Sequence, residues 1–365
     1  MMRLLAPLLV CALFGCRQNS SPAADGAPPP DLPRTVTVDA AEGFAFEVRD
    51  AAFAKLVDTS AGIEVLARGY RWSEGPVWVP QAGMLLFDDV PGNVTYRWRP
   101  GAPGADTFFY PSGYHADPAA DGEPGANGLL LDADGRLLLA RHGERDVARY
   151  QGDLSDDPAH DWRAASRPER FEALTGAYQG SALNSPNDLV QLPSGDVLFT
   201  DPTYGVDKTF GEAARELPFE GVFRYVEATG TTELLTRELE RPNGIVLTPD
   251  ARSFIVASSK PGAPVWTICA VPQAGSAALA CEAFYDASEL ATEANPGNAD
   301  GMVMHPSGVL FATGPGGVLC FSESGQWLGT IRTGRPTANV TLGGEAMDEL
   351  FVTADDVLLR VRLRG

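Results

Sequence analysis

Six positions along the chain carry a short polar side chain immediately before an apolar segment that is interrupted by a turn. They are Glu74, Asn127, Asn187, Asn243, Asp300 and, with a weaker pattern, Asn339. Carboxylate and carboxamide oxygens are hard ligands, and a group of them suits Ca²⁺, which takes about 6–8 oxygens, or Mg²⁺ or Mn²⁺. Each residue alone is also an ordinary turn former, so the chemistry depends on whether the fold brings them together.

The segments that follow these positions read as strand, turn and strand, as in NGLLLDADGRLLLA after Asn127 and DGMVMHPSGVLFAT after Asp300. The polar positions recur at intervals of 53, 60, 56, 57 and 39 residues. Repeats of this length predict the four-stranded blades of a β-propeller. We therefore expect an all-β, six-bladed β-propeller over residues 41–365, with the polar positions converging at one mouth of its central channel.

Composition limits the classes of partner. The chain has 365 residues, 44% of them hydrophobic, and a net charge of −20. Such a hydrophobic fraction is sufficient for a large core. A strongly acidic chain lacks the basic surface that nucleic-acid binding needs, so we expect no nucleic-acid partner. Acidity is compatible with cation binding.

The N-terminus predicts export. Residues 1–16, MMRLLAPLLVCALFGC, combine a basic residue with an apolar stretch too short to cross a membrane and end in Gly15-Cys16. This ending resembles a bacterial lipoprotein signal, which implies cleavage before Cys16 and a lipid on that cysteine; an ordinary secretory peptide is the alternative. Residues 17–40 are rich in Pro, Ala and Ser and predict a flexible tether. The segment 41–59 is compatible with a short helix or a strand.

We thus expect an exported bacterial protein that faces the periplasm or the outside and touches the membrane only through its lipid. Cysteine usage agrees with this address. Cys269 and Cys281 flank an expected hairpin turn and could pair in an oxidising compartment, although the sequence leaves the pairing open. No Cys-x-x-Cys or Cys/His metal spacing is present in the sequence.

A set of motifs occurs in a defined order between residues 71 and 361. They are RWSEGPVWVP at Glu74, ARHGERDVARY at His142, SPNDLVQLPSGDVLFTDPTYG at Asn187, RPNGIVLTPD at Asn243 and NADGMVMHPSGVLFATGPGGV at Asp300. Together they resemble the SMP-30/gluconolactonase/LRE-like family of six-bladed propellers, in its gluconolactonase-type branch. The resemblance implies one divalent cation in the channel, foremost Ca²⁺, with Mg²⁺, Mn²⁺ or Zn²⁺ as alternatives.

The resemblance also implies roles for single residues. The family's metal ligands fall on Glu74, Asn187, Asn243 and Asp300. In another branch the residue matching Asn187 contacts substrate, so both roles stay open, and Asn127 is expected to line the pocket. His142 is either a substrate contact or a structural histidine, and Tyr204 either lines the mouth or belongs to the core. The insertion at residues 103–123 is a candidate roof for the mouth.

The implied reaction is hydrolysis of a sugar lactone, a small-molecule substrate, to an aldonic acid. A cation would polarise the carbonyl and acidify the attacking water. Asp300 is our candidate base and Glu74 an anchoring ligand, although Asp300 could be a ligand only. Two other functions stay open: phosphotriester hydrolysis on the same metal site, and a calcium-binding scaffold without enzymatic activity.

Overall fold

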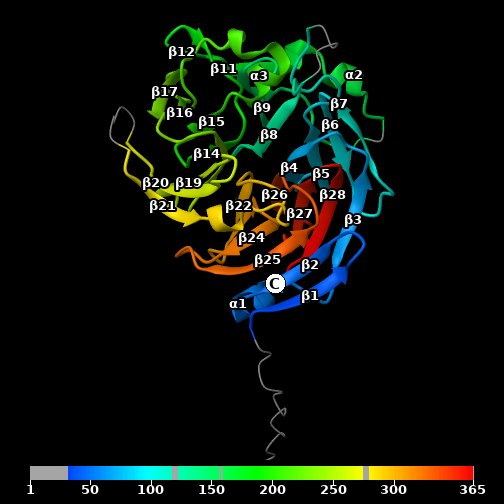
Figure 1. Ribbon diagram of the computed structural model, residues 1–365. Coiled ribbons are helices and arrows are strands. Elements are labelled where there is room, and N and C mark those ends of the chain that lie inside the picture. Colours follow the sequence, from blue (N-terminus) through cyan, green and yellow to red (C-terminus); the bar gives the residue numbers. More distant parts are fainter. Residues whose placement is uncertain (1–31, 117–121, 156, 158, 274–278, 365) are drawn as a thin grey trace, which may run out of the picture. The chain divides into compact units, whose positions relative to one another are not determined.

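The computed structural model describes residues 32–364 except 117–121, 156, 158 and 274–278. These residues form six antiparallel sheets arranged around a central axis (Figure 1). Each inner strand contacts the inner strands of the two neighbouring sheets, in the circular order β4, β8, β14, β18, β22 and β26. The predicted six-bladed β-propeller is therefore confirmed.

The blades follow one another along the chain and run from the centre outward, except that the last blade takes its outermost strand, β3, from the N-terminal side. The first three are β4 (Ser73–Val79), β5 (Met84–Asp89), β6 (Val94–Trp98) and β7 (Ala105–Phe109); β8 (Ala126–Leu131), β9 (Leu137–Arg141), β10 (Asp146–Tyr150) and β11 (Phe171–Thr175); and β14 (Leu189–Gln191), β15 (Val197–Asp201), β16 (Gly221–Val226) and β17 (Thr231–Thr236). The last three are β18 (Pro242–Leu247), β19 (Ser253–Ser258), β20 (Val265–Ala270) and β21 (Cys281–Asp286); β22 (Met302–Met304), β23 (Leu310–Gly314), β24 (Gly317–Phe321) and β25 (Trp327–Thr333); and β26 (Asn339–Gly343), β27 (Glu349–Ala354), β28 (Val357–Arg362) and β3 (Ile63–Arg68).

Short elements lie outside the blades. They are α1 (Ala51–Leu56), α2 (Trp162–Ala165), α3 (Tyr204–Phe210), the strand pair β12 (Ala177–Tyr178) and β13 (Ser181–Ala182), and the 3₁₀ turns η1 (Pro168–Arg170), η2 (Glu212–Ala214) and η3 (Ser288–Leu290). Within the described residues no helix has the length and apolar character needed to cross a membrane.

The core lies between the blades because both faces of each inner region are covered. Every residue of β5 and of β9 is buried; both strands begin with four apolar residues and end in charged ones, Asp88 and Asp89 in β5 and Arg141 in β9. Trp78 of the first blade stacks on Phe351 of the last, with ring centres 5.6 Å apart. This contact also marks the closure of the ring, since β3 from the N-terminal side pairs with β28 near the C-terminus. Closure leaves no gap between the first and last blades.

The N-terminal boundary of the domain differs from the prediction. Residues 34–39 were predicted to belong to the tether because they follow a Pro-rich stretch. They form the strand β1 (Arg34–Asp39). Its sequence RTVTVD alternates Val with polar residues, and Val36 and Val38 pack on the core. β1 pairs with β2 (Phe44–Val48), and β2 extends the fifth blade through β25. The open segment 41–59 contains both a strand, β2, and a helix, α1; the signal and the first part of the tether lie outside the described residues.

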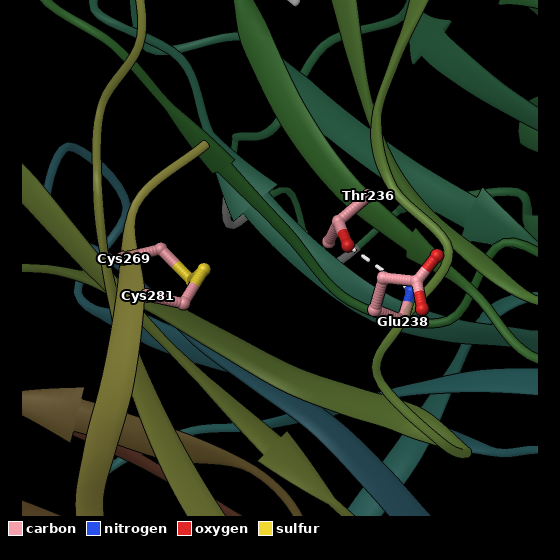
Figure 2. The surroundings of a disulfide bond; sticks show 4 residues. All are labelled: Thr236, Glu238, Cys269 and Cys281. Atoms are coloured by element: carbon pink, nitrogen blue, oxygen red, sulfur yellow. Dashed lines mark hydrogen bonds between the residues drawn. A yellow bond between two sulfur atoms is a disulfide. The ribbon is translucent and has the colours of Figure 1, made fainter. Parts of the chain in front are cut away.

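A disulfide joins the two outer strands of the fourth blade. Cys269 of β20 and Cys281 of β21 are register partners, and their sulfur atoms are bonded (Figure 2). The bond closes the hairpin that was expected between these cysteines. The described residues contain one further cysteine, Cys320, which is buried and free. The pairing that the sequence left open is therefore present in the structure.

We expect the disulfide to stabilise the fold by restricting the unfolded chain. Its loop has a sequence separation of 12 residues, and loops of about this length contribute roughly 2–3 kcal/mol. Replacing both cysteines, Cys269→Ala with Cys281→Ala, should lower the free energy of unfolding by about that amount in urea titrations. Reductant should destabilise the wild type and leave the double variant unaffected. Equal stability of the oxidised wild type and the variant would show that the bond contributes nothing.

Candidate functional site

The central channel opens into a cavity of about 540 Å³. Five of the six repeated polar residues line it, namely Glu74, Asn127, Asn187, Asn243 and Asp300. The sixth, Asn339, is not among the lining residues and donates a hydrogen bond from Nδ2 to Glu74 Oε2 at 3.4 Å. The expected convergence at one mouth of the channel is thus what the structure shows.

Glycines allow the inner strands to approach closely enough for this convergence. A Cβ atom on Gly75 would lie 1.8 Å from the carbonyl oxygen of Asn127, and one on Gly244 would lie 2.1 Å from that of Asp300. The same close approach to the next blade is made by Gly128 and Gly301. Glycine is required because any side chain would push neighbouring blades apart. At four of the six positions, a glycine after the polar residue thus sets the spacing between neighbouring blades.

Glu74 is fixed in one orientation by three donors. It is buried, and its Oε1 accepts a hydrogen bond from Trp72 Nε1 at 3.1 Å. Its Oε2 accepts from Gly75 N at 3.3 Å and from the Asn339 amide. Burial raises the pKa of Glu74 to about 8, and the negative charge of nearby Asp188 adds to the effect. A carboxylate held this way is costly to ionise unless a cation approaches it.

Asp300 lies at the cavity immediately before β22. Its backbone N–H donates to the carbonyl oxygen of Thr313 at 3.2 Å, which fixes the chain at this point. Enclosure by protein raises the pKa of the Asp300 carboxyl well above its usual range, and the charges of Glu74 and Asp188 raise it further. A hydrogen bond with Asn243 acts in the opposite direction.

Asp188 is a third buried carboxylate near the site, and it lies outside the polar positions predicted from the sequence. It occupies the slot that glycine fills in the neighbouring blades. Its Oδ1 accepts from Leu189 N at 2.9 Å, and its Oδ2 accepts from Ile245 N at 3.0 Å in the next blade. Burial raises the pKa of Asp188 to about 6. The departure from the Glu/Asn/Asp-Gly pattern in SPNDLV was the available signal.

The donor set fits a divalent cation. Within the described ranges, Glu74, Asp188 and Asp300 make no ion pair with Lys, Arg or His. No cluster of three or more His, Cys, Asp or Glu suited to a metal occurs in the part of the chain that the structure describes, so carboxamides would have to complete the ligand set. The side-chain amides of Asn127 and Asn187 line the cavity and have no hydrogen-bond partner among the described residues. Two carboxylates with adjacent free amide oxygens suit Ca²⁺ or Mg²⁺ better than zinc.

His142 and Tyr204 lie in different environments. Tyr204, the first residue of α3, lines the cavity, and its hydroxyl donates to the carbonyl oxygen of Arg241 at 3.3 Å. His142 is fully buried, is not part of the cavity lining, and packs against Gly205. Neither ring nitrogen has a hydrogen-bond partner among the residues that the structure describes, and burial lowers the pKa of the imidazole to about 4. A substrate contact by His142 would require Gly205 and its helix to move.

Several lining residues were not anticipated. They include Arg71, Trp72, Glu123, Lys208, Arg241, Ser259 and Asn298. Four of them lie within motifs that were recognised: Arg71 and Trp72 in RWSEGP, Arg241 in RPNG and Asn298 in NADG. Glu123, the last residue of the insertion 103–123, pairs with Lys208 of α3 beside the cavity. Residues 117–121 lie outside the described part of that insertion.

Several known proteins are similar to this chain. A family model described as "SMP-30/Gluconolactonase/LRE-like region" matches residues 72–356. A gluconolactonase of Zymomonas mobilis is 35% identical over 85% of this chain and 83% of its own, and a pentonolactonase of Haloferax volcanii is 25% identical over 82% and 84%. The solved structure of a gluconolactonase from Xanthomonas campestris shares 27% identity and a TM-score of 0.70, covering 87% of this chain and 94% of its own.

The role assigned to the glycines predicts a specific defect. In Gly244→Ala the new Cβ would meet the Asp300 carbonyl, so we expect the free energy of unfolding to fall by about 1–3 kcal/mol or more and cation binding, measured by calorimetry, to weaken. Gly104→Ala is the matched control, because a Cβ there meets no atom within 4 Å. If Gly244→Ala behaved like the control, blade spacing would not depend on this glycine.

Proposed function

Because the chain belongs to the SMP-30/gluconolactonase/LRE-like family, we propose that it hydrolyses a sugar lactone to the aldonic acid with the aid of a divalent cation. The observation that carries the proposal is the pair Glu74 and Asp300, two enclosed carboxylates at one cavity with no basic partner in the described structure. The proposed ligands are Glu74, Asn187, Asn243 and Asp300. Ca²⁺ is the foremost candidate, and Mg²⁺, Mn²⁺ and Zn²⁺ are the alternatives to be compared with it.

The two carboxylates would have different roles. When bound, the cation would polarise the lactone carbonyl and acidify the attacking water. Glu74 is held by donors on both of its oxygens and would act as an anchor. Asp300 has the less constrained carboxylate and would accept the proton of the attacking water. The water oxygen would bond to the carbonyl carbon, the bond from that carbon to the ring oxygen would break, and the ring oxygen would leave as a hydroxyl by taking the proton that Asp300 had accepted from the water.

The carboxamides would orient the substrate. Asn127 presents an amide group to the cavity that is free to hydrogen-bond to sugar hydroxyls, and Asn187 would do so in its alternative role as a substrate contact instead of a cation ligand. Tyr204 adds an aromatic wall beside them. The volume of about 540 Å³ is sufficient for one monosaccharide lactone. Holding the ester against Asp300 and the water would contribute by proximity and orientation.

Removal of metal should abolish turnover. We expect the intact chain, stripped by a chelator, to release acid from glucono-1,5-lactone no faster than the spontaneous background. Ca²⁺ or another divalent ion should restore hydrolysis, because the charge of Glu74 and Asp300 would otherwise be uncompensated. A pH-stat follows the acid directly. No restored activity in protein shown to be folded and to bind metal would exclude this lactone and favour a scaffold.

Variants refine the same measurement. Glu74→Gln should weaken cation binding, whereas Asp300→Asn should also lower kcat at saturating metal by about 10²-fold or more, the usual contribution of a general base. Glu282→Gln removes a carboxylate from the exposed surface of β21 and serves as the control. Full activity of both site variants would rule out the site. A clear preference for phosphotriesters over lactones would show that phosphotriester hydrolysis, and not lactone hydrolysis, is the reaction of this site.

We also propose that the protein is exported and carries a lipid on Cys16. The disulfide between Cys269 and Cys281 supports maturation in an oxidising compartment. Metabolic labelling with a radioactive fatty acid in a bacterial host should mark the wild type and leave Cys16→Ala unlabelled. Label in both proteins, or in neither while the chain is exported, would contradict lipid attachment at this cysteine and leave an ordinary secretory signal.

A further inference from the structure

The charges around the cavity do not cancel once a cation is present. Glu74 and Asp300 together match one divalent ion, Asp188 behind them adds one further negative charge, and Glu123 is paired with Lys208. The remaining charged lining residues are Arg71 and Arg241, and in the described structure neither makes an ion pair with a carboxylate. The loaded cavity would therefore carry a surplus of positive charge in a chain whose net charge is −20. Such a surplus favours an anionic ligand.

Arg241 is held in place by contacts to its backbone and its side chain. Its φ of 48° lies in the left-handed region, and its N–H donates to Glu220 Oε2 at 2.8 Å. Its carbonyl accepts from the Tyr204 hydroxyl, and its guanidinium carbon lies 4.8 Å from the centre of that ring. A stacked guanidinium keeps its N–H edges available. A left-handed conformation at a residue other than glycine is costly and often marks a functional position.

The neighbouring acidic groups are occupied by other partners. Asp207 pairs with Arg215, and Glu220 accepts from the backbone N–H and the hydroxyl of Thr203 in addition to the Arg241 N–H. Neither carboxylate lies within ion-pair distance of the Arg241 guanidinium. The positive charge of Arg241 is thus not neutralised by direct contact.

Arg71 is the weaker candidate of the two. It is exposed, and one of its guanidinium nitrogens already donates to the carbonyl oxygen of Pro91 at 3.0 Å. It precedes the inner strand β4, whereas Arg241 precedes β18 in the blade three positions further around the ring. The two arginines therefore lie on opposite sides of the mouth, and one small ligand would meet the more fixed of them first.

We propose that Arg241 binds an anionic substituent of the lactone, a carboxylate or a phosphate, and that acidic or phosphorylated sugar lactones are the preferred substrates. This inference rests on the proposed lactonase function. Arg241 stands two residues before Asn243, so an anion bound to it would belong to the same sugar ring or chain as the carbonyl at the cation. Guanidinium groups recognise carboxylate and phosphate through paired N–H···O bonds.

The test compares specificity constants for three lactones in metal-loaded protein: glucono-1,5-lactone, its 6-phosphate, and the 1,4-lactone of glucaric acid, which retains a free carboxylate. Wild type should prefer an anionic lactone, and Arg241→Gln should reduce the ratio of anionic to neutral kcat/KM by about 10- to 100-fold, as loss of a charge-assisted hydrogen bond predicts. Arg241→Lys should recover part of the ratio.

Arg252→Gln is the matched control. Arg252 lies in the exposed turn between β18 and β19 and does not line the cavity. Its substitution therefore removes the same charge from the same blade without changing the cavity. Its ratio should equal that of the wild type. A higher kcat/KM for the 6-phosphate than for the glucaric acid lactone, or the reverse, identifies which anionic substituent Arg241 prefers.

Two outcomes would overturn the inference while leaving the lactonase intact: hydrolysis of the neutral lactone without any anionic preference, or the same ratio in wild type and Arg241→Gln. If no lactone were hydrolysed, the proposed function itself would fail. Calorimetric titration with gluconate and 6-phosphogluconate would then decide on Arg241 separately. Tighter binding of the phosphorylated acid that depends on Arg241 supports its anion-binding role, and its absence overturns it.

Discussion

The whole arrangement depends on how closely six inner strands can approach one axis. A Cβ on Gly75 or Gly244 would overlap the carbonyl oxygen of the next blade, so the ring can close at this radius only with glycine at those positions. The polar residue in front of each glycine is then carried to the mouth of the channel. The same packing aligns backbone groups for hydrogen bonds between blades, such as Gly128 N to Asn187 O at 2.7 Å and Gly301 N to Ala338 O at 2.8 Å. The packing between neighbouring blades and the polar lining of the cavity therefore depend on the same pairs of residues, a polar residue followed by glycine.

This economy has an electrostatic cost. Glu74, Asp188 and Asp300 are brought together in an enclosed region, and burial raises the pKa of all three carboxyl groups. The charge of Asp188 raises the pKa of Glu74 further, and the charges of Glu74 and Asp188 do the same for Asp300. Asp188 reduces its share by accepting two backbone N–H bonds, one of them from the neighbouring blade. The other two face the cavity, where only a ligand can compensate them. The strands thus supply the constant part of the site, while α3 and the end of the insertion 103–123 supply a rim whose charges can vary without disturbing the ring.

The fold and the polar ring could be predicted from the sequence because both arise from a pattern that repeats along the chain. Strand pattern, turn residues and the recurrent polar position agree with one another, which is when prediction from sequence is most dependable. The rim was not predictable in the same way, since Arg241 and Lys208 reach the cavity through a local helix and a left-handed residue that have no periodic signature. β1 was missed because its alternation is only six residues long and follows a Pro-rich stretch. Asp188 was overlooked because it replaces a glycine instead of matching one.

The N-terminal hairpin gives the domain a direction. Phe44 pairs with Thr333, at the end of β25 that leads to the cavity-lining Thr337, whereas Arg34 pairs with Val48 at the other end of the hairpin. At about 3.3 Å per residue, β1 therefore carries the chain roughly 17 Å along the blade toward the mouth. A polypeptide that enters at Arg34 arrives on the side remote from the substrate opening. Attachment of the domain through Arg34 would therefore leave the mouth of the cavity uncovered, so that small molecules could diffuse into it.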